Sequence, residues 1–269
     1  RRLRLAQPPL SRHIRTLEEK IGTALFNRTQ RTVALTAAGA LFYDETRGLL
    51  TQLVRAGDAA KRSALGETQR LRLGFVSAVL SSELVDVLRV FRRENPAVQI
   101  LLQDQPPAAQ LEAISRGLLD GGFPGLAPRD RPAGVTFLRW RTEELACFVP
   151  AGHALSERTS ISLKEVKGEA FVAITREAAP AFAAHVQGLC RDAGFRPRVV
   201  LESPRAQAVA VMVAAGSGIA LLPVSLARVV GNAAVAVPFK KASPIAHVFA
   251  HTSGPLIPAM KAFVAVLGR

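Results

Sequence analysis

The chain has 269 residues, enough for one or two domains, and 49% of them are apolar, which is ample for a hydrophobic core. No apolar run is long enough to cross a membrane, and the only cysteines are Cys147 and Cys190. The composition therefore excludes a membrane-spanning or disulfide-built protein. We expect a cytoplasmic protein with two buried structural thiols, a redox-sensing cysteine pair being the alternative. The net charge of +14 favours a polyanionic partner.

Basic residues concentrate at the start of the chain. Residues 1–31 contain eight Lys or Arg against two Glu, a net charge of +6. Within this segment Leu10, Ile14, Leu17 and Ile21 recur at intervals of four, three and four. This spacing predicts a helix with one apolar face.

The opposite side of this helix suits DNA. It carries Ser11, Arg12 and Arg15, side chains that bind phosphates and base edges. Gln7 and Pro8 fall in the first turn, where proline is tolerated because the N–H groups there lack an intrahelical partner. The alternative is a basic face that only contacts solvent. The residues that follow the helix distinguish this alternative from a DNA-binding face.

A short basic hairpin follows the helix. Gly22 ends the helix, an apolar segment occupies 24–26, and residues 27–36 are polar and basic with a β-branched end. This order predicts a wing beside the recognition helix, with Arg28, Thr29 and Arg31 near the DNA backbone or minor groove. Thr36 is placed to cap a new helix.

This order of residues resembles LysR-type transcriptional regulators. The family's recognition-helix pattern falls on Gln7, Pro8, Leu10, Ser11, Ile14, Leu17, Glu18, Gly22, Leu25, Phe26 and Arg28, and its Leu-Thr-x-x-Gly string on Leu35, Thr36 and Gly39. The resemblance implies that Gln7, Pro8, Ser11, Arg12 and Arg15 contact the major groove of double-stranded DNA. Ala6 departs from the many relatives that carry a capping Ser. Relatives also have one helix and most of another before the point where this sequence begins, so it resembles an N-terminally truncated member that, as written, should bind DNA poorly.

A long helix is predicted from Thr36 to about Gly66. Seven positions follow steps of three and four, typical of a coiled-coil seam: Ala38, Phe42, Thr46, Leu49, Leu53, Ala56 and Ala60. Packing against the chain's own second domain is one way to cover the seam. The resemblance implies another, self-pairing into a homodimer or homotetramer that reads two half-sites. Residues 66–69 are the predicted hinge.

From Leu71 onward strand and helix patterns alternate, which predicts a parallel α/β sheet. Strands are expected at 71–76, 98–103, 121–123, 144–149, 171–174, 198–202, 219–222 and 247–251, and helices at 81–95, 108–119, 180–193, 205–215 and 258–267. The strings at 152–155 and 214–223 also resemble the LysR family. The resemblance implies an α/β effector domain of two Rossmann-like lobes, similar to periplasmic binding proteins.

In such sheets ligands bind beyond the carboxyl ends of the strands, where helix N-termini favour anions. This rule selects an effector site at Ser77, Ala78, Pro107, Thr175 and Ser203. A helix-capping role is the alternative for each Ser or Thr. We expect a small carboxylate, and the Ala-Gln-Pro-Pro-Leu-Ser string resembles the aromatic-catabolism branch, which implies an aromatic acid or a muconate-like dicarboxylate. Pro107 departs from relatives that carry a hydroxyl residue in that loop.

The sequence gives no support for a catalytic or cofactor-binding site. The sequence lacks a nucleophile elbow, a phosphate-binding loop and a zinc-protease helix. The segment 216–218 is expected to form a tight turn before a strand. His247 and His251 are expected on a strand, where four residues separate them by about 13 Å, too far to share a metal. We therefore expect no enzyme, no metal and no cofactor.

The sequence thus predicts a partial winged helix-turn-helix at 1–36, a linker helix at 37–66 and an effector domain at 71–269. The resemblance implies that effector binding alters subunit packing, DNA bending and RNA polymerase recruitment. A solute-binding protein with a basic leader is the alternative, and an enzyme on an α/β scaffold is a weaker one.

Overall fold

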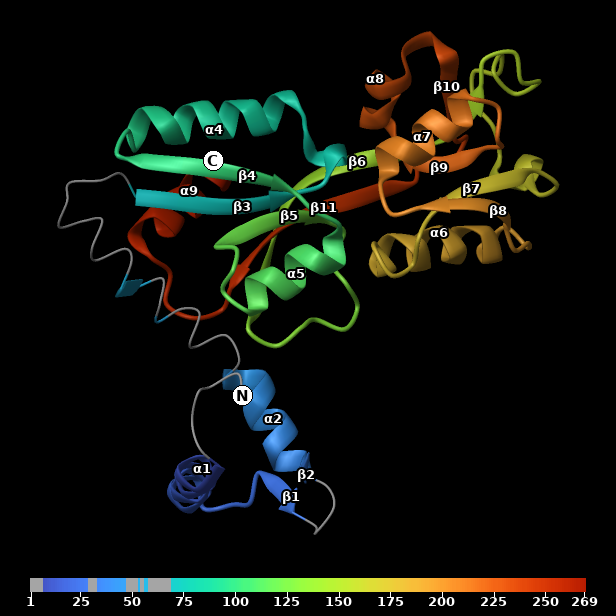
Figure 1. Ribbon diagram of the computed structural model, residues 1–269. Helices are drawn as coiled ribbons and strands as arrows, with labels where there is room; N and C mark the ends of the chain where they lie inside the picture. Colours follow the sequence, from blue (N-terminus) through green and yellow to red (C-terminus); the bar gives the residue numbers. More distant parts are fainter. Residues whose placement is uncertain (1–6, 29–32, 47–52, 54–55, 58–68) are drawn as a thin grey trace. The chain divides into compact units, whose positions relative to one another are not determined.

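The computed structural model describes residues 7–28, 33–46, 53, 56–57 and 69–269, which fall into two compact units, Arg1–Val54 and Arg55–Arg269 (Figure 1). Each unit is described by itself. The first contains the predicted recognition helix and wing, and the second is the predicted effector domain.

The recognition helix α1 spans Gln7–Ile21 and ends as its sequence predicts. Gly22 follows in the left-handed conformation at φ 79°, and its N–H donates to the carbonyl of Glu18 at 2.9 Å. The Glu18 carboxylate accepts from the N–H groups of Leu25 and Phe26 at 2.8 and 3.0 Å. Glu18 therefore sets the direction in which the chain leaves the helix.

The wing is a two-stranded antiparallel sheet of β1 (Phe26–Arg28) and β2 (Val33–Leu35). Helix α2 (Ala37–Thr46) follows, capped by Thr36, whose hydroxyl accepts from the N–H of Gly39 at 2.9 Å. A Cβ at Gly39 would overlap the carbonyl oxygen of Leu25. The glycine of the Leu-Thr-x-x-Gly string is therefore needed because α2 packs directly on the chain that enters the wing.

The predicted linker helix is described only in part. Residues 53 and 56–57 are helical like α2, and the other positions between 46 and 69 lie outside the described residues. Leu41 and Leu53 are 66% and 70% exposed. The predicted hinge also falls mostly outside the described residues, except for Gln69, which already belongs to a strand.

The first lobe of the second unit is built on three parallel strands. β3 (Gln69–Phe75) lies between β4 (Val98–Asp104) and β5 (Gly121–Gly125). Helices α4 (Ser82–Glu94) and α9 (Pro258–Leu267) bury Phe91 and Phe263 against one sheet face, with Phe123 and Phe249. Helix α5 (Pro107–Ser115) covers the other face (Figure 1).

Two antiparallel strands connect the lobes. β6 (Val135–Pro150) is 16 residues long, and β11 (Pro244–Thr252) pairs with its first part. The second part of β6 pairs with β9 (Ala220–Pro223) and β10 (Ala234–Pro238). The prediction of a strand only at 144–149 was therefore too short, because the long-range pairing with β11 orders residues 135–143 as well.

The second lobe combines these strands with a parallel pair, β7 (Ala170–Ile174) and β8 (Arg198–Ser203). Helices α6 (Pro180–Asp192) and α7 (Ala206–Ala214) belong to this lobe, with the short α8 (Ala227–Val230) after β9. Cys147 and Cys190 are both buried in its core and are free thiols. The prediction of buried structural cysteines is confirmed.

Three-residue and four-residue 3-10 turns complete the chain: η1 (Ser77–Val79), η2 (Leu163–Val166), η3 (Val224–Leu226) and η4 (Gly231–Ala233). One predicted helix was too long, and one strand was not predicted. The helix expected at 108–119 ends at Ser115, because Gly117 adopts φ 67° and Leu118 and Leu119 fold back onto the carbonyl of Ala113. Strand β10 was missed, although it pairs with five residues of β6.

Candidate functional site

A cavity lies between the two lobes, at the carboxyl ends of β3, β4, β5, β7, β8 and β9. The empty space in and in front of it, open solvent included, is about 560 Å³. Its apolar walls come from both lobes: Val76, Pro106, Pro107, Pro124, Leu126, Ile174, Ala179, Phe182, Pro204, Pro223 and Ile245. A mostly apolar lining with a few orienting polar groups is typical of sites for small organic molecules.

A buried glutamine positions one wall of the cavity. Gln110 is fully buried in α5, and its Nε2 donates to the carbonyl of Gln105 at 2.8 Å, on the loop that lines the cavity. Gly74 and Gly122 make room for it, since a Cβ at either would come within 2.9 Å of the Gln110 side chain. A buried polar group that loses its hydrogen-bond partner costs free energy, so this hydrogen bond holds the loop at Gln105 in place.

An ion pair bridges the lobes beside the cavity. Arg205, just before α7, donates to the Asp104 carboxylate at 2.6 Å and to its carbonyl at 3.3 Å. Both side chains line the cavity and both are partly exposed. A backbone hydrogen bond from Ala108 to Ala178, 3.1 Å long, also joins the lobes. The two lobes are thus in direct polar contact in this conformation.

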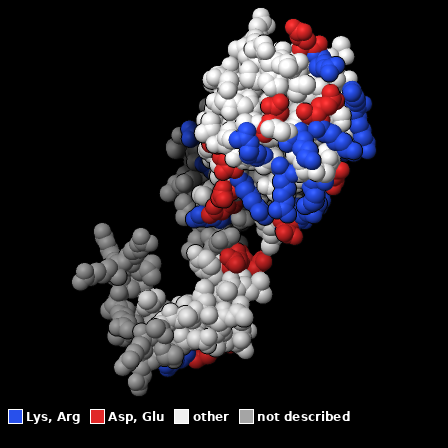
Figure 2. All heavy atoms as spheres, turned by 90° about the vertical axis from the view of Figure 1, so that its right-hand side faces the viewer, with Lys and Arg blue, Asp and Glu red and all other residues white. Residues whose placement is uncertain are grey.

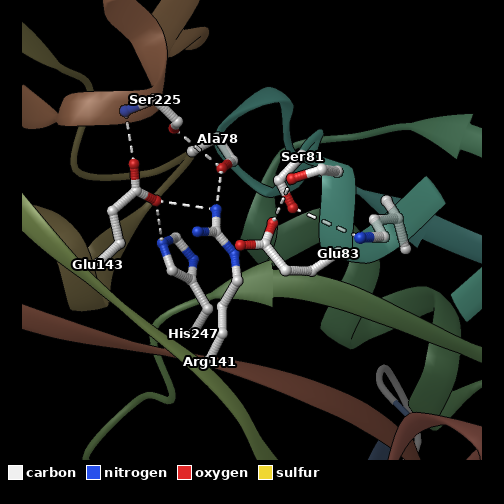
Figure 3. Close-up of polar contacts among 9 residues, drawn as sticks. Ala78, Ser81, Glu83, Arg141, Glu143, Ser225 and His247 are labelled. Carbon is white, nitrogen blue, oxygen red and sulfur yellow. Dashed lines mark hydrogen bonds and ion pairs between the residues drawn. The ribbon is translucent and has the colours of Figure 1, made fainter. Parts of the chain in front are cut away.

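A second polar cluster lies where the connecting strands pass between the lobes (Figure 3). Glu143 of β6 accepts from His247 Nε2 and Arg141 at 2.9 Å each, and from the N–H of Ser225 at 2.5 Å. Arg141 and the Ser225 hydroxyl both donate to the carbonyl of Ala78, at 2.7 and 3.1 Å. We call these five residues the hinge cluster, since they join η1 of the first lobe, η3 of the second and both connecting strands.

The electrostatics of the hinge cluster favour an ionised Glu143. Burial alone would raise the pKa of its carboxyl, but hydrogen bonds from His247 and Ser225 and the charge of Arg141 outweigh burial and lower that pKa. An ionised carboxylate only accepts hydrogen bonds, so we assign the proton to His247 Nε2. The other ring nitrogen, Nδ1, is buried and has no hydrogen-bond partner among the described residues.

The structure brings three of the five predicted effector residues onto the cavity wall, namely Ser77, Ala78 and Pro107. The other two lie beside it, where the N–H of Thr175 donates to the carbonyl of Ser203 at 3.0 Å. The Ser203 hydroxyl accepts weakly from the N–H of Arg205 at 3.4 Å, but no side chain caps α7. Their contact with an effector stays a prediction.

Sequence reasoning missed the hinge cluster and the ion pair. His247 was considered only as a metal ligand, and Arg141 and Glu143 fall in a segment without a clear strand pattern. Asp104 and Arg205 are 101 positions apart, and no local signal joins them. His247 and His251 do lie on strand β11, as predicted.

On the DNA-binding side, Ser11, Arg12 and Arg15 are exposed on α1, whereas Leu10, Ile14 and Leu17 are half-buried. Gln7 and Pro8 form the first turn of the helix, and Arg28 ends β1. Thr29 and Arg31 lie outside the described residues. Ile21, the fourth residue of the predicted apolar face, is 38% exposed, so the predicted division of α1 is confirmed for Leu10, Ile14 and Leu17 only.

The effector domain has a basic surface of its own. Figure 2 shows Lys and Arg side chains gathered on the face turned to the viewer, with some Asp and Glu among them.

Over the described part of the chain, no three His, Cys, Asp or Glu side chains are grouped to hold a metal. None of the helices described there is long and apolar enough to span a membrane.

Comparison with known proteins identifies the family. Residues 1–40 match the profile "Bacterial regulatory helix-turn-helix protein, lysR family", and residues 64–269 match "LysR substrate binding domain". The chain is 33% identical over 268 residues to the HTH-type transcriptional regulator XapR of Escherichia coli (strain K12), covering 99% of this chain and 90% of that protein. The chain belongs to the LysR family of transcriptional regulators. Its relatives are regulators rather than enzymes, so neither the enzyme nor the solute-binding alternative holds.

Solved structures agree with this fold. The BenM effector binding domain with its effector benzoate aligns with a TM-score of 0.63 at 25% identity, covering 75% of this chain and 91% of that one. Full-length CbnR complexed with its target DNA aligns with a TM-score of 0.68 at 24% identity, covering 100% and 91%, and supports the fold alone. The second unit therefore has the periplasmic-binding-protein-like fold that the sequence predicted.

Proposed function

We propose that this regulator binds a small carboxylate, an aromatic acid or a muconate-like dicarboxylate, in the cavity between its lobes, and that binding changes its action on DNA. The observation that carries this proposal is the cavity itself, with apolar walls from both lobes and few polar groups. A ligand that touches both lobes can shift the balance between their open and closed arrangements, because it gains contacts only when both walls are near.

The lining favours a flat apolar body with a polar end. Pro106, Pro107, Phe182 and Ile245 offer apolar surface, while Ser77 supplies a hydroxyl at the start of η1. The BenM effector domain, similar in fold, is described with benzoate. That similarity supports an aromatic acid as the effector of this protein but does not identify which acid it is.

We further propose that α1 reads the major groove through Gln7, Pro8, Ser11, Arg12 and Arg15, with Arg28, Thr29 and Arg31 of the wing near the DNA backbone or minor groove. The exposure of Ser11, Arg12 and Arg15 on one side of α1 supports this. Arginine can pair with guanine through two hydrogen bonds, and each such contact is worth about 1–3 kcal/mol of sequence discrimination.

We also propose that the protein is a homodimer or homotetramer that works in the cytoplasm, where its DNA is, and recruits RNA polymerase. Exposed apolar residues on a sheet edge support self-association. Among the described strands β8 pairs with β7 only, and Val199, Val200 and Leu201 on it are 41–45% exposed. Exposed apolar edge strands pair readily with another chain. Leu201→Glu should lower the mass measured by analytical ultracentrifugation, and an unchanged mass would remove β8 from the interface.

The DNA proposal is tested with the protein's own upstream intergenic region, by footprinting and fluorescence anisotropy across a salt series. Arg12→Ala should weaken binding to the protected site by about 1–3 kcal/mol and reduce its preference over random DNA. Lys261→Ala is the matched control, since Lys261 is an exposed cation on α9. Equal losses for both variants would show that only general charge is at work.

The effector proposal is tested by adding benzoate or cis,cis-muconate and following the footprint. Ser77→Ala should leave DNA binding unchanged and abolish the effector-dependent change. Ser253→Ala, at an exposed position away from the cavity, is the control. A normal response of Ser77→Ala would remove Ser77 from the site. No response of the unaltered protein to either acid would refute the proposed effector class.

A further inference from the structure

His247 connects the hinge cluster to the effector cavity. The side chain is 1% exposed, and the residue lines the cavity from strand β11. Its Nε2 lies 2.9 Å from the Glu143 carboxylate (Figure 3), while its buried Nδ1 finds no partner in the described part of the chain. A buried ring nitrogen without a partner is uncommon and calls for an explanation.

A glycine forms the cavity wall beside this nitrogen. Gly125, also on the cavity wall, adopts φ 84°. A Cβ built there would lie 4.0 Å from His247 Nδ1 and would meet no atom closer than 3.8 Å. The cavity wall next to Nδ1 is therefore loosely filled at Gly125, and no described residue competes with a ligand for a hydrogen bond to Nδ1.

The cavity offers an incoming anion few side chains that can carry a positive charge. An anion that leaves water needs a compensating positive charge. Among the residues that line the cavity, Arg205 is already paired with Asp104, and His247 is the other side chain that can become a cation. The ionised Glu143 on the far side of the ring stabilises that cation, and its hydrogen bond fixes the proton on Nε2.

We propose that His247 recognises the effector's carboxylate, taking up a proton on Nδ1 as the effector binds and donating it in a hydrogen bond to a carboxylate oxygen. This inference rests on the proposed carboxylate effector. The proton comes from solvent and no covalent bond changes. Since Glu143 also accepts from Ser225 and Arg141, the same event reaches the contacts that join the lobes.

Other charged groups lie near the His247 ring, and the test must distinguish their protonation from that of His247. Glu143 and Arg141 approach from β6, and Glu83 at the start of α4 acts electrostatically on Arg141. Asp104 and Arg205 line the same cavity from β4 and the start of α7. Ser225 from η3 and Gly125 from β5 bring no charge. The test must therefore assign the proton to His247 itself.

The measurement is calorimetric titration of the full-length protein with benzoate or cis,cis-muconate, in buffers of different ionisation enthalpy. We expect uptake approaching one proton per ligand and an affinity that falls as the pH rises, by at most about tenfold per pH unit. His247→Gln keeps an amide near Glu143 and removes the titrating nitrogen, so proton uptake and the pH dependence should disappear. His251→Gln, a buried histidine of the same strand bonded to the carbonyl of Thr252, should keep both.

Imidazole nitrogen shifts in nitrogen-15 NMR of the unaltered protein give a second readout that needs no variant. Ligand addition should convert one histidine to its doubly protonated form. Binding without proton uptake, or uptake that persists in His247→Gln, overturns the inference and leaves the proposed function intact. Absence of saturable binding by the unaltered protein refutes the carboxylate effector, and this inference with it.

Discussion

Replacing Glu143 with alanine tests whether the hinge cluster stabilises the effector domain. Three donors meet its carboxylate, from Arg141, His247 and the N–H of Ser225. The side chains of Arg141 and Glu143 are only 15% and 7% exposed, so water cannot readily replace the lost partner. Removing one member of a buried charged pair costs about 3–5 kcal/mol. That is a large share of the roughly 5–15 kcal/mol by which folded domains are stable.

Urea unfolding followed by tryptophan fluorescence measures this loss directly. Trp140 is the only tryptophan of the chain and lies on β6 in contact with Phe123, with ring centres 4.7 Å apart, so its emission reports on this domain. Asp86→Ala is the matched control, because Asp86 pairs with Arg89 at an exposed position. Exposed pairs contribute about 0–1 kcal/mol. If Glu143→Ala unfolds at the same urea concentration as Asp86→Ala, the hinge cluster does not stabilise the domain.

The pH dependence of this stability has a defined direction. The folded protein lowers the pKa of Glu143, so its contribution is complete above the ordinary glutamate value of about 4.3 and is lost as the pH falls through the lowered value. The stability difference between the unaltered protein and Glu143→Ala should therefore be present near neutral pH and shrink in acid. A difference that grew in acid would contradict the assignment of an ionised Glu143.

Two further predictions concern other parts of the chain. Gly39→Ala should displace α2 from the start of the wing, because its Cβ overlaps the Leu25 carbonyl, and should weaken DNA binding by an amount corresponding to about 1–3 kcal/mol of strain, while effector binding persists. Gly57→Ala, where a Cβ meets no atom within 4 Å, is the control in the same anisotropy assay, and equal affinities would contradict the packing argument. Burial raises the pKa of Cys147 to about 12 and that of Cys190 to about 11, so neither thiol should react with a disulfide reagent at mildly alkaline pH until the protein unfolds. Rapid labelling of these thiols in the native protein would contradict this prediction and favour the redox-sensing alternative.

Local patterns in the sequence were enough to predict much of the fold. The intervals between Leu10, Ile14 and Leu17 predicted α1 and its two faces, because a helix brings residues three and four apart onto one side. Thr36 caps α2 as predicted, since a cap involves only neighbouring residues. Ser77 and Pro107 were placed on the cavity by a general rule about strand ends.

The tertiary structure decided what depends on distant partners. The strand from 135 to 143 exists because β11, more than a hundred residues later, supplies its hydrogen bonds. Arg141, Glu143 and His247 each look like ordinary residues of a strand, and only the crossing of β6 and β11 between the lobes gathers them with Ser225. Helices and caps could be predicted from sequence because their contacts are local. The hinge cluster could not, because its energy comes from burial and charge pairing between segments that only the folded chain brings together.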